Sequence, residues 1–446
     1  MSLLKKYLVN DGVELRLDRE IIGGFGTFLT LSYIFLLNPI LLSQAGMPLS
    51  AAFFATVLSA ALSTLFMAFY ARLPFAVAPA PSITTFFVGY VCLTLGIEWQ
   101  VALAAVVVSG VLSVIMAILA VRAQLISAMP AALKYGILLS LCGFLLGNGL
   151  FQAGLVDYSG TIVALGQAFD QIDVLRQHAI ILAVGLGLSV VLAMPPFNFR
   201  GSPIVGILAA TGVASSFGIL LDTQTSFSDD MFATFFQADF LGLFSSAAIL
   251  SIIVIFIIDF FGGVGKFVGL FAAMGVDRHQ FRDKELEKSL SVDGVGNMIG
   301  GFLGASSLAV FISSAVGIKA GARTGVAAVV VAALMLASFV FIPLVGSIPR
   351  QATSGILIYI AFILVPWNQV IDAFKNKSSE FSKLDFLIGV SAFLISFLSF
   401  SIDKSLAVLF VVYSLLMIRK GFKVKHSIFY ITTILLSAAV LFQEFT

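Results

Sequence analysis

The sequence predicts an all-α polytopic membrane protein. Of its 446 residues, 60% are hydrophobic and only 11% are charged, against about 25% charged in soluble domains. Such a chain has too little polar surface to cover itself in water, so most of it must face lipid or other apolar helices. A membrane-spanning helix needs about 20 apolar residues, and with its loop each crossing takes roughly 30, so the length accommodates about 14 transmembrane segments.

The apolar stretches form two sets of seven, separated by a polar break. The first set is predicted at 21–43, 51–70, 74–95, 100–121, 131–151, 178–195 and 203–221. The second set is predicted at 242–272, 289–303, 305–321, 324–346, 352–372, 384–401 and 405–418. After the basic stretch Arg419–His426, the apolar run Ile428–Phe442 is either a fifteenth span or an interfacial helix lying on the membrane.

The charges in the connections orient these segments, because basic residues accumulate in cytoplasmic loops. Basic residues before the first span predict a cytoplasmic N-terminus, and the expected location is the bacterial cytoplasmic (inner) membrane. The run Asp277–Lys288, which alternates in sign, is predicted to be a solvated loop joining the two halves. The residues that this alternation places inside are Lys5, Lys6, Arg16, Arg19, Arg72, Arg122, Arg200, Arg278–Lys288, Arg323, Lys375 and Lys377.

The composition also argues against several other classes of protein. A net charge of +2 indicates no basic surface for nucleic acid. Cys92 and Cys142 both lie inside apolar runs and the three histidines have no ligand spacing, so we expect no disulfide framework, metal site or cofactor. A membrane-embedded enzyme is not expected, because the chain lacks an HExxH motif and a Ser/Cys–His set. A passive channel is not expected either, because no ring of charge is visible.

Two segments differ from ordinary spanning helices. The segment RLPFAVAPAPSITTFF carries Pro74, Pro79 and Pro81 inside an apolar run, where proline cannot continue a helix. The segment GGFLGASSLAVFISSAVGIKAGARTG is rich in Gly and Ser. Both are either kinked helices that pack through small residues or broken helices whose ends meet at the membrane midplane, as in transporter sites. Each is the third of its set and they enter from opposite sides, which favours broken third and tenth spans in a 7+7 inverted repeat.

Three stretches carry a resemblance to a known family. They are EIIGGFGTFLTLSYIFLLNPILLSQAGMP (Glu20–Pro48), IIDFFGGVGKFVGL (Ile257–Leu270) and SVDGVGNMIGGFLGASSLAVFISSAVGIKAGARTG (Ser291–Gly325). They resemble the purine-permease (AzgA-like) branch of the nucleobase:cation symporter, or xanthine–uracil permease, family. The resemblance implies a core domain and a gate domain, with the core carrying substrate by an elevator-like movement, usually in a homodimer. The implied core domain comprises residues 21–122 and 242–346, and the implied gate domain comprises 131–221 and 352–418. Residues 1–20 form the cytoplasmic N-terminus, and 419–446 contain the basic stretch and the unplaced apolar segment.

The chain departs from the family pattern at positions where the family touches substrate. Gly262 stands where the family has an acid and Lys266 where it has a threonine. Ser313 replaces a family glutamate, and Thr84 replaces an asparagine. In the family, the two carboxylates accept N–H bonds from the base and help to couple transport to protons, and both are missing here.

The broken helix ends, near Ser82–Thr84 and Ala309–Ile312, would each carry about half a positive charge. Two such ends favour an anion or an electronegative edge of a ligand. Lys266 either adds to this site or snorkels from the end of a tilted helix. Ser306 and Ser307 bind either the ligand or freed backbone groups. The candidate substrate-binding residues are Ser82, Thr84, Gly262, Lys266, Ser306, Ser307 and Ser313.

Asp259 is the candidate group for coupling transport to a proton or cation, because apolar residues flank it on both sides. A charge at membrane depth seldom occurs without a partner or a task. Alternatively, Asp259 caps a broken helix or pairs with Lys266, two turns along the same face. Asp293 is as well explained as a helix N-cap as by a role in the site, and Phe86 and Phe87 are expected to pack in the core or against lipid.

The sequence therefore predicts a secondary active transporter for a nucleobase-like solute, coupled to protons or another cation. Its predicted partners are a small-molecule substrate, the coupling ion, the lipid bilayer and a second copy of the chain, with no nucleic acid. The alternative is transport of a small organic or inorganic anion on the same scaffold, because Lys266 is added and the acids at Gly262 and Ser313 are absent.

Overall fold

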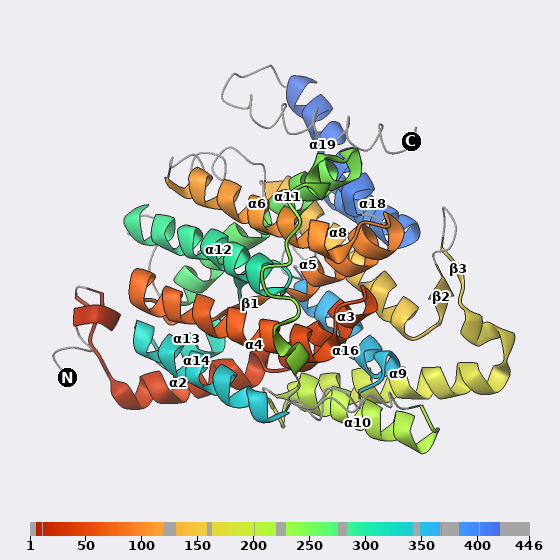
Figure 1. Cartoon of the computed structure of the whole chain (residues 1–446), viewed down its shortest axis with the longest axis horizontal. Coiled ribbons are helices and arrows are strands. Elements are labelled where there is room, and N and C mark those ends of the chain that lie inside the picture. The colour runs from red at the N-terminus through yellow and green to blue at the C-terminus, as the bar shows by residue number, and fades with distance from the viewer. Residues whose placement is uncertain are drawn as a thin grey trace.

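The structure is a computed structural model in which helices predominate (Figure 1). It describes residues 6–10, 12–118, 131–157, 163–199, 201–219, 229–274, 283–311, 313–341, 348–365, 367, 383–400 and 402–419. The apolar run at 428–442, and the basic residues Arg122, Arg200, Lys375 and Lys377, lie outside these ranges.

The first half of the chain forms helices at the positions of the seven predicted spans. The first span is interrupted at Ser32 and Tyr33, and the third begins as a strand before it becomes helical. The elements are α2 (Leu17–Leu31), α3 (Ile34–Gln44), α4 (Leu49–Phe66) continued by the π-helical η1 (Met67–Ala71), β1 (Val77–Pro79), α5 (Pro81–Thr85) continued by the π-helical η2 (Phe86–Thr94), α6 (Trp99–Ile118), α8 (Ala131–Gln152), the short strands β2 (Val156–Asp157) and β3 (Ala164–Leu165), α9 (Ile172–Ala193) and α10 (Ser202–Ser216).

The second half repeats this pattern of a strand followed by a short helix at its third predicted span. One prediction fails here: residues 283–288 of the predicted solvated loop Asp277–Lys288 are helical and begin α12. The elements are α11 (Ser246–Ala273), α12 (Asp283–Leu303), β4 (Leu308–Val310), α13 (Ser314–Lys319), α14 (Gly325–Ala337), α16 (Arg350–Leu364), α18 (Lys383–Ser399) and α19 (Ile402–Arg419).

Among the described residues, five helical segments are long and apolar enough to cross a membrane: Leu17–Gln44, Leu49–Ala71, Trp99–Ile118, Tyr135–Gln152 and Ile172–Ala193. The surface is also apolar, as Ile118, Val340 and Leu415 are all more than half exposed. Soluble monomers rarely expose large contiguous apolar patches, so these faces are suited to lipid. The count of 14 spans and the inverted repeat stay predictions.

The helices pack in two groups (Figure 1). In one group α12 packs against α6 and α4, and α14 packs against α2 and α4. The other group contains the pairs α8–α18, α8–α16, α9–α10 and α9–α16. The close approach of α6 and α12 depends on glycine, because a Cβ added at Gly294 would lie 2.9 Å from the carbonyl oxygen of Gly110.

Strands β1 and β4 join the two halves of the chain at the centre of the first group. They are antiparallel, with Val77 opposite Val310 and Ala78 opposite Ala309, and all their residues are buried. Each strand precedes a short helix, so both predicted broken spans are interrupted as the sequence indicated.

Candidate functional site

Polar side chains and one backbone carbonyl satisfy backbone groups that the first broken span releases. The Thr64 hydroxyl accepts a bond from Val77 N (3.0 Å) and donates to Val77 O (2.9 Å). Ala76 N donates to the Ser314 hydroxyl at 3.0 Å, and Ala80 N donates to Ser307 O at 3.2 Å. Because water is absent at membrane depth, such internal bonds are what make non-helical backbone tolerable there.

A chain of hydroxyl and amide groups crosses the site from α4 to Ser306, two residues before β4. The Asn38 amide on α3 donates to Thr56 Oγ1 at 2.8 Å and accepts from Thr84 Oγ1 at 2.6 Å. The Thr84 hydroxyl also shares a hydrogen bond with the Ser306 hydroxyl. Asn38, Thr84 and Ser306 are fully buried. The predicted site residues Thr84 and Ser306 are thus brought together, with most of their hydrogen-bonding capacity used inside the protein.

Two carboxylates, one from α11 and one from α12, are linked to β4 by hydrogen bonds, Asp293 directly and Asp259 through Asn297. Asn297 donates through its amide to Asp259, and its amide oxygen accepts bonds from Ser307 Oγ (2.8 Å) and Leu308 N (2.7 Å). One turn earlier on α12, Asp293 accepts a bond from Val310 N at 3.1 Å. Both aspartates are buried. Asp293 therefore binds the backbone of the broken span rather than capping its own helix.

Lys266 lies within electrostatic range of both carboxylates. It is partly exposed and is attracted by Asp293 and, more weakly, by Asp259. Its ammonium is therefore part of a mixed-charge cluster with Asp259 and Asp293, which we call the charge cluster.

The remaining predicted site residues are only partly described. The backbone of Ser82 lies in α5 and that of Gly262 in α11, but the surroundings of both positions lie outside the described side chains. Ser313 precedes α13, and its buried hydroxyl has no hydrogen-bond partner within the part of the chain that the structure describes. Phe86 and Phe87 are fully buried, as expected for packing.

The second helix end is displaced from its predicted place. Residues Leu308–Val310 form β4 and α13 begins only at Ser314, so Ala309 offers strand rather than helix N–H groups. Ile312 lies outside the described residues. The prediction of a helix end near Ala309–Ile312 is wrong for its described part, because the residues pair with β1 instead of starting a helix.

Several residues of the site were not singled out from the sequence. Asn38, Asn297 and Thr64 each bond backbone or acid groups at the broken spans. Thr85 is fully buried, and its hydroxyl has no hydrogen-bond partner among the described residues. Their polarity could have indicated a role in the site, since Asn38 and Asn297 interrupt apolar stretches of the sequence, where an amide without a hydrogen-bond partner is costly.

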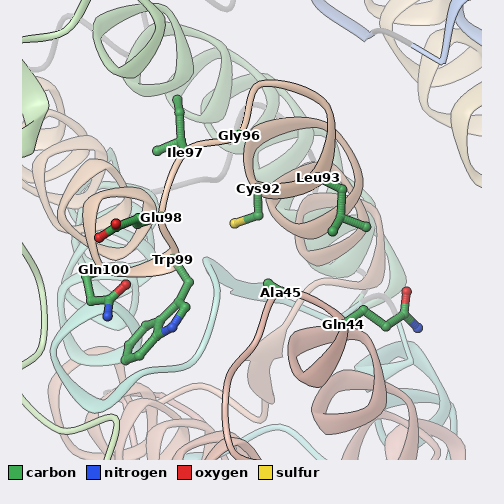
Figure 2. Close-up of a pocket in the computed structure, with 9 residues that line it drawn as sticks. All are labelled: Gln44, Ala45, Cys92, Leu93, Gly96, Ile97, Glu98, Trp99 and Gln100. Atoms are coloured by element: carbon green, nitrogen blue, oxygen red, sulfur yellow. The ribbon is translucent and has the colours of Figure 1, made fainter. Parts of the chain in front are cut away.

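A cavity of about 420 Å³ opens where α3 and η2 end and α6 begins (Figure 2). Its lining includes Gln44, Cys92, Glu98 and Trp99, and Figure 2 shows the Cys92 sulfur directed into the space between these segments. The Gln44 side chain at its rim exchanges two hydrogen bonds with Gln152 on α8, at 3.1 and 2.8 Å. This cavity lies at the ends of the helices that carry Asn38 and Phe86 and is separate from the β1–β4 pair.

The chain is similar in sequence to known permeases. The model of a permease family, named for xanthine and uracil permeases, matches residues 18–368. The chain is 29% identical over 407 residues to an adenine permease of Escherichia coli, covering 90% of this chain and 87% of that one. It is 32% identical over 381 residues to a guanine/hypoxanthine permease of Bacillus subtilis, covering 80% and 84%. A Methanocaldococcus jannaschii protein, named as a permease without a substrate, is 31% identical over 439 residues, covering 98% and 97%.

The fold is similar to that of a solved membrane transporter. The transmembrane domain of a cyanobacterial bicarbonate transporter superposes with a TM-score of 0.65, covering 89% of this chain and 98% of that one. The sequence identity is 14%, so this similarity describes the fold alone.

Proposed function

This chain belongs to the permease family whose model it matches, and from this premise we propose that it is a secondary active transporter of purine nucleobases. It is an integral membrane transporter and not an enzyme. The proposal extends this to a purine substrate such as adenine, guanine or hypoxanthine, to coupling with protons or another cation, and to elevator-like alternating access. A homodimer with cytoplasmic N-termini in the bacterial inner membrane is part of the same proposal.

The observation that carries the proposal is the alignment with purine permeases along most of the chain. Relatives named for adenine and for guanine/hypoxanthine match 90% and 80% of it. The family model matches residues 18–368, which include both broken spans and the charge cluster. The match therefore spans the elements on which a substrate site would be built.

The chemistry around β1 and β4 suits a neutral, polar ligand. A purine presents N–H donors and ring-nitrogen acceptors, and hydroxyl groups can serve both. The hydroxyls of Thr85 and Ser313 are buried and have no hydrogen-bond partner among the described residues. We propose that they bind the base, with Ser82, Thr84, Gly262, Ser306 and Ser307 shaping the same site and Asp259 and Lys266 at the coupling position.

The alternative substrate class, a small anion, is not favoured. Its main support in the sequence was the positive charge of Lys266. The acids Asp293 and Asp259 attract that ammonium, and with both acids ionised the three groups have a formal charge of −1. A net negative cluster repels an anion, and the relatives are named for purines.

The test of the substrate is uptake of labelled adenine, guanine, hypoxanthine, uracil and bicarbonate by proteoliposomes at two internal and external pH values. We expect uptake of at least one purine, with accumulation that follows the imposed pH or cation gradient. Empty liposomes and unlabelled competitor provide the background. Uptake of bicarbonate with no purine uptake would replace the proposal by the anion alternative, and accumulation without a gradient would remove the coupling.

The elevator component has its own test, because Gln44 and Gln152 join helices assigned to different moving parts. In a background without the native cysteines, the pair Gln44→Cys and Gln152→Cys is bridged with a short thiol cross-linker. We expect uptake to stop and to return on reduction. The matched control bridges Ser140→Cys to Ser405→Cys, whose hydroxyls lie 2.7 Å apart on α8 and α19 of the proposed gate. Unchanged uptake after bridging the first pair contradicts movement of α3 against α8.

A further inference from the structure

The segment that leads from the first half of the chain into α11 lies on the helices of the first packing group. It contains two short 3₁₀ helices, η4 (Asp229–Phe232) and η5 (Gly242–Phe244), joined by turns. In Figure 1 it is the green segment in front of α4 and α12. We call residues 229–244 the strap.

Two hydrogen bonds attach the strap to the end of α12. Phe236 N donates to Phe302 O at 2.6 Å, and the Thr234 hydroxyl donates to Leu303 O at 2.9 Å. These carbonyls belong to the last turn of α12, where a helix has acceptors without intrahelical partners. Thr234 is fully buried, and a Cβ at Gly304 would collide with it. The strap therefore terminates α12 and fits closely against it.

The strap also crosses the first turn of α6. Asp239 N donates to Gln100 O at 3.0 Å, and the Asp239 carboxylate accepts a bond from Leu241 N at 2.9 Å. A Cβ at Gly242 would collide with Val101. The turn between Asp239 and Gly242 is thus fixed against the beginning of α6.

Aromatic rings join the strap to α4. The rings of Phe232 and Phe235 lie 5.1 and 5.9 Å from that of Phe54, measured between centroids. Phe54 in turn stacks on Phe339, which follows α14, at 4.8 Å. Pairs of this kind contribute about 0.5–1.5 kcal/mol beyond the area they bury. The strap therefore connects α4, α6, α12 and the end of α14.

These contacts place the strap at one boundary of the hydrocarbon layer. Helix α6 has 20 residues and is long and apolar enough to span a membrane. Its length of about 30 Å equals the thickness of the hydrocarbon core, so its first turn lies at the edge of that core. Helices α4 and α6 begin at the strap and α12 ends there, so the strap runs along that edge.

The strap leaves large apolar side chains uncovered. Phe236, Leu241 and Phe244 are 74%, 82% and 84% exposed. Soluble surfaces rarely gather such side chains, whereas aromatic residues are enriched where a membrane meets water. Val111 on α6 is exposed as well, so the uncovered face of the strap continues the apolar surface of a spanning helix.

The charges of the strap favour lipid over a second copy of the chain as the occupant of this face. Residues 229–244 contain three aspartates and no lysine or arginine, and Asp230 and Asp239 are exposed. A symmetric contact between two copies would set these acidic segments against each other without a basic partner in the strap. At a membrane surface the carboxylates stay in water, beside the ammonium groups of zwitterionic headgroups.

We propose that the strap is an interfacial membrane anchor, in which Phe236, Leu241 and Phe244 enter the boundary between headgroups and acyl chains of one leaflet. Because its backbone is bonded to α6 and α12, the anchor sets the depth of these helices in the bilayer. The proposal goes beyond the proposed function, since its ligand is the lipid bilayer and its tests do not measure uptake.

The first experiment measures the depth of spin labels in liposomes of zwitterionic phospholipid. Labels are attached to Leu241→Cys and Phe244→Cys in a background with Cys92→Ser and Cys142→Ser, and their accessibility to oxygen and to a water-soluble nickel chelate is compared. We expect both labels about 5–10 Å below the lipid phosphates. Val111→Cys should lie deeper, and Asp230→Cys, the matched control on the strap, should lie in water.

Two results of this experiment would overturn the anchor. One is that the labels at positions 241 and 244 are as accessible to the nickel chelate as the label at Asp230→Cys. The other is that they are shielded from oxygen and show spin–spin broadening that disappears on dilution with unlabelled protein, because a second copy would then cover this face.

A second measurement uses the unsubstituted chain and remains decisive if a labelled variant does not fold. The wild type is reconstituted with phospholipids that carry a photoactivatable group either near the headgroup end or near the methyl end of the acyl chain. Mass spectrometry should find residues 236–244 linked to the first probe and the middle of α6 linked to the second. A strap that neither probe labels refutes the anchor, whereas a chain that takes up no purine refutes the proposed function alone.

Discussion

Removing the carboxylate of Glu20 should destabilise the fold strongly, although this residue lies at the edge of the first span. The backbone N–H groups of Arg323, Thr324 and Ala327 donate to it at 2.9, 3.1 and 3.3 Å. Thr324 is the N-cap of α14, Arg323 precedes it and Ala327 lies in the first turn. A helix N-terminus has donors without intrahelical partners and a partial positive charge. Glu20 is 1% exposed, so water cannot easily replace it.

The magnitude follows from the number of donors that lose their acceptor. A buried donor left unsatisfied costs about 1–3 kcal/mol, so three donors, two of them closely bonded, give about 3–5 kcal/mol for Glu20→Ala. Glu20→Gln keeps one acceptor oxygen but turns an amide group toward one donor, which gives about 1–2 kcal/mol. Both variants should therefore lower the free energy of unfolding, with Ala the more damaging.

The assay is reversible unfolding in mixed micelles titrated with SDS, followed by circular dichroism. Glu14→Gln is the matched control, because Glu14 is exposed and forms a salt bridge with the exposed Arg16 at 2.9 Å. Exposed pairs contribute little to stability, so this variant should unfold as the wild type. The capping role is refuted if Glu20→Ala loses less than about 1 kcal/mol or is no less stable than Glu14→Gln.

Three further substitutions test the packing and the broken spans. Gly294→Ala should cost about 1–3 kcal/mol of unfolding free energy, because α6 leaves no room for a Cβ. A Cβ at Gly187 would meet open space, so Gly187→Ala should be neutral or stabilising. Equal Tm values for Gly294→Ala and Gly187→Ala would contradict the crowding at Gly294. Asn297→Leu should lower the free energy of unfolding by about 3 kcal/mol through loss of the amide between Asp259 and β4, and wild-type stability would count against that bridge. Thr64→Val should speed amide hydrogen exchange at Val77, and unchanged exchange would show that the hydroxyl does not protect it.

The positions of the helices could be predicted from the sequence because lipid imposes a simple rule on composition and length. The two interrupted spans were also predictable, since Pro79 and Pro81 in one and Gly and Ser in the other disfavour continuous helix. The start of α12 was missed because its first residues, Asp283–Lys288, lack apolar residues at helical spacing. Glu and Lys are nonetheless good helix formers, and only hydropathy argued for a loop there.

The partners of polar side chains could not be predicted, because they join residues that are distant in sequence. Glu20 is the first residue of the family-like stretch Glu20–Pro48, and nothing in the sequence around it indicated that it caps α14. The pairing of β1 with β4 likewise depends on the two halves packing together. Asp293 was as well explained as an N-cap of its own helix as by a role in the site, and in the structure it accepts a bond from Val310 in the next element.

Several polar side chains at the broken spans form hydrogen bonds to backbone groups, which reduces their capacity to bind a ligand. Strands as short as β1 and β4 are not stable alone, and in a membrane their N–H and C=O groups must be satisfied internally. Thr64, Ser314 and Asn297 meet this need. The hydroxyls of Thr85 and Ser313, next to the two broken spans, are among the buried hydroxyls that have no hydrogen-bond partner in the described ranges. Because an unsatisfied buried hydroxyl is costly, these two positions are where a substrate would contribute most to the stability of the folded protein.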